Sequence, residues 1–111
     1  MSGDDRHPAI EDVELTDVFA ALADPVRLAT VRTLAALGAS PCNELHDSAG
    51  LTVSRSTFSH HQKVLREAGI IRERINGAQR VLTVRTQDLQ TRFPGLLDVV
   101  LRQCPESDPA N

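Results

Sequence analysis

The 111-residue chain contains no tryptophan and no tyrosine, and aromatic residues make up only 3% of it. Modules that bind single-stranded nucleic acid stack bases on exposed aromatic side chains, so this composition argues against them. No apolar run approaches the ~20 residues needed to span a bilayer, and no signal-like apolar segment stands at the N-terminus. With only two cysteines, Cys42 and Cys104, we expect a cytoplasmic protein whose thiols are reduced.

A catalytic constellation is also missing from the sequence. There is no glycine-rich phosphate loop, and the histidines are scattered. Ser59 stands beside His60, but adjacency in sequence does not orient a nucleophile toward its base. We therefore expect neither enzymatic activity nor a cofactor.

The charge is distributed unevenly along the chain. Residues 1–50 carry three basic and nine acidic groups, a net of −6, whereas residues 51–92 carry eight basic and three acidic groups, a net of +5. One contiguous basic third in a chain of net charge −3 is typical of a polyanion-binding protein. Charge alone leaves open an unevenly charged, solvated face.

Apolar periodicity predicts a domain over residues 10–104, between disordered tails at 1–9 and 105–111. Leu15, Val18, Phe19 and Leu22 fall at i, i+3, i+4 and i+7, one stripe of a helix. Asp-Pro and Ser-Pro pairs mark helix starts, and glycines mark helix ends. The predicted helices cover residues 11–23, 25–37, 41–48, 54–68 and 96–101.

After Gly69 the apolar period changes from 3.6 to 2. Two strand-like runs, 70–75 and 79–85, flank Asn76-Gly77, which is the strongest short-range signal for a β-hairpin. The predicted fold is mainly α with a β-hairpin wing: five helices plus a two-stranded antiparallel hairpin, arranged as a winged helix-turn-helix. In this fold the helix over 54–68 enters the major groove of DNA.

Three stretches, LADPVRLATVRTLA, STFSHHQKVLREAGII and RERINGAQRVLTVR, resemble the ArsR/SmtB family of bacterial transcriptional repressors. The resemblance covers residues 15–102. It implies a homodimer joined through the first and last helices, which binds a palindromic operator on double-stranded DNA and releases it when a small-molecule inducer binds. The expected dimer interface consists of Leu15, Val18, Phe19, Leu96, Leu97, Val100 and Leu101.

The expected DNA contacts lie on the outer face of the fourth predicted helix and on the hairpin. They are Ser54, Arg55, Ser56, Thr57, Ser59, His60, Lys63, Arg74, Asn76, Gly77 and Arg80. Neighbours on a helix point about 100° apart, so the adjacent His60 and His61 make a poor chelate. We expect His60 to contact DNA and His61 to pack inward. Gln62 follows where the family often has an apolar residue.

The family's metal-binding motifs are not matched here. Pro41 and Asn43 occupy the thiolate positions that the resemblance assigns to the third helix, and Cys42 takes the place of an inward valine. The last helix has no histidine, and the second helix lacks the cysteine of the redox-sensing members. We therefore predict no metal site.

The sequence is compatible with two other functions. One is a winged-helix module that binds a protein partner, which would show apolar residues on the outer face of the fourth helix. The other is a thiol-based metal or redox sensor that uses Cys42 and Cys104.

Overall fold

The computed structural model describes residues 7–48 and 53–102. A 3₁₀ turn, η2 (Ile10–Asp12), precedes the helices. The helices are α1 (Leu15–Leu22), α2 (Pro25–Leu37), α3 (Cys42–Ser48), α4 (Arg55–Glu67), α5 (Thr86–Arg92) and α6 (Leu96–Arg102). The strands are β1 (Ser40–Pro41), β2 (Ile71–Asn76) and β3 (Gln79–Val84).

Side-chain caps fix the starts of α2 and α4. The Asp24 carboxylate accepts hydrogen bonds from the backbone N–H groups of Val26 and Arg27 at 2.8 and 3.2 Å. The Ser54 hydroxyl accepts one from the Thr57 N–H at 3.1 Å. These bonds satisfy backbone donors that have no partner within the helix, so the predicted starts are confirmed.

A glycine in the left-handed region ends α4. Gly69 has a φ of 88°, and the N–H groups of Gly69 and Ile70 donate to the carbonyls of Arg66 and Leu65. This pair of bonds is the Schellman motif. A Cβ at position 69 would also collide with the Val13 side chain, so both backbone conformation and packing require glycine here.

The wing is a two-residue hairpin whose turn lies one residue later than its Asn-Gly signal suggests. Asn76 pairs with Gln79, so Gly77 and Ala78 form the loop. Gly77 has a φ of 66°, and no non-glycine residue among those described has a positive φ. Glycine at the first loop position alone is the pattern of a type II′ turn, which matches the twist of the strands.

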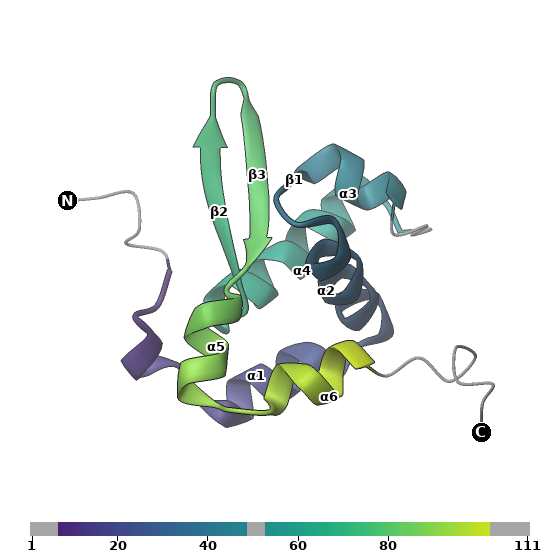
Figure 1. The fold of residues 1–111 in the computed structure, drawn as a ribbon. Helices are drawn as coiled ribbons and strands as arrows, with labels where there is room; N and C mark the ends of the chain where they lie inside the picture. The colour runs from purple at the N-terminus through teal and green to yellow at the C-terminus, as the bar shows by residue number, and fades with distance from the viewer. Residues whose placement is uncertain (1–6, 49–52, 103–111) are drawn as a thin grey trace.

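The core lies where α2, α3 and α4 meet the base of the sheet, and the wing projects away from it (Figure 1). Val31 and Leu34 from α2, Leu45 from α3, Leu65 from α4 and Leu82 from β3 are fully buried. α1 and α6 lie at the end of the molecule opposite the wing tip. No helix in the described ranges is long and apolar enough to cross a membrane.

Two elements correct the predicted count of five helices and two strands. α5 was not predicted because its sequence, TQDLQTR, buries only Leu89 and so has no apolar stripe. β1 was predicted as a helix start, yet Ser40 and Pro41 pair with Leu82 and Val81 of β3. The sheet therefore has three strands in the order β1-β3-β2.

Two residues of the predicted N-terminal tail, His7 and Pro8, contact the domain. His7 is buried, and its Nε2 accepts a hydrogen bond from the Glu73 N–H at 3.0 Å. The Pro8 carbonyl accepts one from Arg85 at 2.8 Å. The remaining tail residues and Cys104 lie outside the described residues.

Candidate nucleic-acid interface

α4 has one buried face and one exposed polar face. Phe58, His61, Gln62 and Leu65 are buried against the rest of the domain. All the α4 positions predicted to contact DNA are exposed, and so is the cap before them: Ser54, Arg55, Ser56, Thr57, Ser59, His60 and Lys63. None of these is apolar. The face therefore lacks the surface expected of a protein-docking module and offers hydrogen-bond donors and positive charge.

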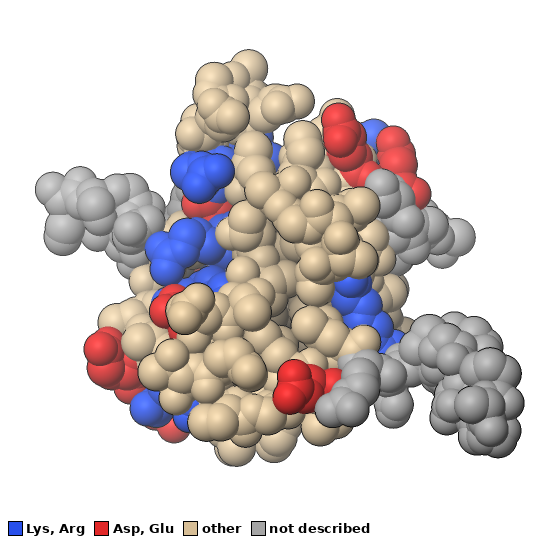
Figure 2. All heavy atoms as spheres, viewed as in Figure 1, with Lys and Arg blue, Asp and Glu red and all other residues tan. Residues whose placement is uncertain are grey.

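The wing supplies the second part of the candidate surface. Arg74, Asn76, Gly77 and Arg80, the wing residues predicted to contact DNA, are exposed. Figure 2 shows Lys and Arg side chains gathered along the flank of the hairpin. Helix and wing thus present basic and polar groups from two separate parts of the sequence.

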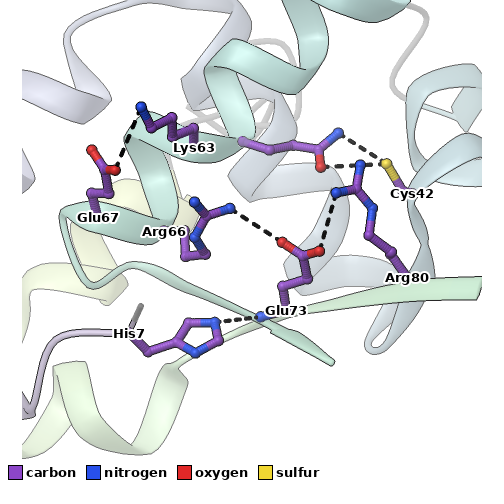
Figure 3. A network of polar contacts seen from close by, with 8 residues as sticks. His7, Cys42, Lys63, Arg66, Glu67, Glu73 and Arg80 are labelled. Atoms are coloured by element: carbon purple, nitrogen blue, oxygen red, sulfur yellow. Dashed lines mark hydrogen bonds and ion pairs between the residues drawn. The ribbon is translucent and has the colours of Figure 1, made fainter. Parts of the chain in front are cut away.

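A buried carboxylate, missed by the sequence analysis, connects the wing to α4. The Glu73 side chain is only 2% exposed. Its Oε1 lies 3.2 Å from the Arg66 guanidinium of α4, and its Oε2 lies 3.3 Å from that of Arg80 on β3 (Figure 3). His7 binds the Glu73 backbone from the opposite side. The only signal in the sequence is an acidic residue inside a strand with arginines on both sides.

The two adjacent histidines have different environments, as predicted. His60 is exposed, whereas His61 is 8% exposed and its Nδ1 lies 3.1 Å from the Arg27 guanidinium. Burial lowers the pKa of His61, and the nearby Arg27 lowers it further against the raising effect of Asp24. Because a guanidinium can only donate, Nδ1 accepts this bond and the ring is neutral.

Cys42 is half-buried at the start of α3 and contacts Gln62 of α4. The Gln62 amide nitrogen donates to the Cys42 sulfur at 3.0 Å, and the thiol lies 3.3 Å from the amide oxygen. Gln62, which departs from the family pattern, is therefore a polar partner for this thiol. Within residues 7–48 and 53–102, no three His, Cys, Asp or Glu side chains cluster closely enough to hold a metal ion.

The predicted dimer residues separate into three groups by their exposure. Val18 and Leu97 are buried within their own chain, so the structure assigns them to the core and not to a partner-facing surface. Leu15 and Phe19 remain exposed on α1, Phe19 by 52%. Leu96, Val100 and Leu101 are partly buried. Val99, which was not predicted, is 67% exposed on α6.

Comparisons with known proteins agree with this geometry. Residues 22–74 match the family described as a helix-turn-helix domain. The chain is 33% identical over 91 residues to YceK of Bacillus subtilis (strain 168), an uncharacterized HTH-type transcriptional regulator. The matched region covers 81% of this chain and 89% of YceK. The chain belongs to the helix-turn-helix transcriptional regulators.

Solved structures share the winged-helix fold that the resemblance implies. The transcriptional repressor BigR from Xylella fastidiosa is 27% identical, with a TM-score of 0.61 over 81% of this chain and 86% of BigR. Mb0332 from Mycobacterium bovis, a possible ArsR-family regulator, shares the fold at 24% identity. Its TM-score is 0.64 over 80% of this chain and 79% of that fragment, a homodimeric winged helix-turn-helix DNA-binding domain.

Proposed function

We propose that this regulator is a cytoplasmic repressor that binds a palindromic operator on double-stranded DNA as a homodimer. The observation that carries the proposal is the exposed polar face of α4 beside the exposed arginines of the wing. In winged helix-turn-helix proteins the N-terminal part of the recognition helix reaches base edges in the major groove. Here that part holds Arg55, Ser56 and Ser59.

The proposed dimer uses the apolar surface at the other end of the molecule. Leu15, Phe19 and Val99 are exposed large apolar side chains on α1 and α6. Association of two copies through this surface removes it from water, which is favourable at about 25 cal/mol per Å² of apolar area. A two-fold dimer also presents two recognition helices to two half-sites, which explains the expected palindrome.

Dimerisation is tested by placing a charge on this surface. Val99→Glu puts a carboxylate where the partner's apolar side chains are expected, so burial in the dimer becomes costly. Analytical ultracentrifugation should show dissociation of the variant, with Asp98→Glu as the matched control on the same helix. A variant dimer as stable as the wild-type dimer argues against this interface.

DNA binding is tested through its dependence on salt. Lysine and arginine contacts to phosphates release counterions, so log Kd should rise linearly with log salt concentration. The experiment is fluorescence anisotropy on a duplex selected from a random library, at several salt concentrations. A slope near zero contradicts the proposal, and so does equal affinity for the selected and a scrambled duplex.

The inducer is proposed to be a small molecule other than a metal ion. Support comes from Pro41 and Asn43 at the expected thiolate positions, and from the absence of histidine in α6. The test is titration of zinc, nickel, cobalt, copper(I) and arsenite into the operator complex. Release by one of these ions in the wild type, and not in a Cys42→Ser/Cys104→Ser variant, instead makes the protein a thiol-based sensor.

A further inference from the structure

A small cleft lies where the wing meets α3 and the start of α4. Its volume is about 270 Å³. The lining residues come from three elements and the hairpin turn: Cys42, Asn43, Arg55, Ala78, Gln79 and Arg80. One predicted DNA contact of the helix, Arg55, and one of the wing, Arg80, therefore line the same cleft.

The charge of this cleft is entirely positive. Arg55 and Arg80 supply two guanidinium groups, and among the described residues no carboxylate lines the cleft. Asn43 and Gln79 add side-chain amides, which donate hydrogen bonds. Two guanidinium groups with neutral donors favour an anion with several acceptor oxygens.

Glu73 holds one of these guanidinium groups in place without cancelling its charge. It belongs to β2 of the wing, and its carboxylate lies 3.3 Å from Arg80 and also pairs with Arg66. One carboxylate is thus shared by two guanidinium groups, and the three side chains keep a net charge of +1. Arg80 remains half exposed, with 48% of its side chain accessible to an incoming anion.

The size and the charge of the cleft together indicate which ligand it can bind. Pockets for organic ligands usually measure roughly 300–1,000 Å³, so this cleft suits a single phosphate group better than a drug-sized molecule. A larger hollow, about 400 Å³, lies between α1, α2 and α4 and includes Asp17 and Glu67 beside Arg27. Its excess of carboxylates disfavours a phosphate there.

We propose that the cleft binds one phosphate group of the DNA backbone, clamped between Arg55 of α4 and Arg80 of the wing. This inference rests on the proposed DNA binding and specifies how it is positioned. A phosphate held by both elements fixes the wing relative to the recognition helix, and so sets the register of base contacts. Cys42 lines the cleft, so a bound phosphodiester shields its thiol.

The first test is a double-variant cycle on operator binding. If Arg55 and Arg80 hold the same phosphate, Arg55→Gln and Arg80→Gln each remove that contact, and the second substitution adds little. The double variant should weaken binding by clearly less than the product of the two single effects. For the double variant, the slope of log Kd against log salt concentration should fall by about 1, as expected for the loss of one phosphate contact.

The matched control pairs Arg55→Gln with Arg74→Gln. Arg74 is exposed on the wing but does not line the cleft, so its effect should multiply with that of Arg55→Gln. Multiplicative effects in both pairs, with a slope change of about 2 for Arg55→Gln/Arg80→Gln, overturn the shared phosphate. Thermal melts of all variants establish that they fold.

The second test uses Cys42 as a reporter in a Cys104→Ser background. We expect a saturating operator duplex to slow iodoacetamide alkylation of Cys42 at least several-fold. Saturating duplex should give less protection in the Arg55→Gln/Arg80→Gln variant than in the Arg55→Gln/Arg74→Gln variant. Inorganic phosphate at constant ionic strength should protect weakly, through the same chemistry.

The outcomes separate the two proposals. If anisotropy shows no binding to any duplex, the proposed function fails. If the duplex binds but iodoacetamide alkylates Cys42 as fast as in the protein without DNA, only the proposed phosphate site fails. If millimolar inorganic phosphate protects Cys42 fully and the duplex adds nothing, the cleft belongs to a free anion, and its assignment to the DNA backbone is overturned.

Discussion

The two faces of α4 show how one helix combines a structural and a binding role. The inner face carries Phe58, His61 and Leu65, whose surroundings are protein atoms. The outer face carries polar and charged side chains exposed to solvent. His60 and His61 are chemically identical neighbours, but the ~100° turn between them exposes one and buries the other. Position around the helix therefore decides whether a substitution changes stability or binding.

The largest expected effect is a loss of stability from the inner face. Leu65 is fully buried in the core, so Leu65→Ala should lower the free energy of unfolding by about 2–5 kcal/mol through lost burial and the remaining cavity. Urea unfolding followed by circular dichroism measures it. The control is Ser59→Ala on the outer face, with a change within about 0.5 kcal/mol. Equal losses in the two variants would erase the distinction between the faces.

The outer face should show the opposite behaviour. His60→Ala should weaken binding to the selected operator by about 1–3 kcal/mol, the usual size of a specific base contact. It should leave the melting temperature unchanged, because the ring is exposed. Fluorescence anisotropy and thermal melts on the same samples measure the operator affinity and the melting temperature. An operator affinity equal to that of the wild type would show that His60 does not contact the DNA.

The pH dependence of the folding stability gives a further test of the difference between the two faces of α4. His61 has a lowered pKa in the folded protein, so the unfolded chain binds a proton more readily. Stability should be fully present above the ordinary histidine pKa of about 6.5 and should fall as pH decreases below it. Protonation would also place an imidazolium beside Arg27, at the present 3.1 Å contact.

The measurement is urea unfolding at pH 7.5 and pH 5.5. His61→Gln keeps an acceptor for Arg27 but cannot titrate, so its stability should change less than that of the wild type. Asp24 does not interfere, because its lowered pKa keeps it ionised across this range. An identical pH dependence in the variant would show that His61 does not control it.

The smallest expected effect on stability concerns Lys63. Its ammonium lies 3.8 Å from Glu67, and both side chains are more than half exposed. Such a pair contributes only about 0.3–0.5 kcal/mol, so Lys63→Ala should barely change the unfolding free energy. Its salt slope for operator binding should nevertheless fall by about 1 if Lys63 contacts a phosphate. Glu67→Ala is the control: it breaks the same pair without removing positive charge, and its slope should not fall.

Local signals in the sequence determined the main elements and the exposed surface. Asp24-Pro25, Ser54 and Gly69 act through backbone atoms within a few residues, so their effect is readable without the fold. The hairpin was predictable for the same reason, although pairing of Asn76 with Gln79 moved its turn by one residue. The expected DNA contacts on α4 are exposed because helical periodicity already separates outer from inner faces. The expected contacts on the wing are exposed for a different reason: residues 74–80 are all exposed, without alternation, because this part of the hairpin projects away from the core.

Only the tertiary structure decided which distant residues meet. Glu73 binds Arg66, Arg80 and the ring of His7, and no local pattern links residue 73 to residue 7. β1 forms because Ser40 pairs with Leu82 of β3, a residue distant in the sequence. Val18 and Leu97 are likewise buried by elements that are far from them in the sequence. The cleft beside Cys42 likewise exists only where α3, α4 and the wing converge. Periodicity tells which face of an element is apolar, but the packing of separate elements determines what covers that face.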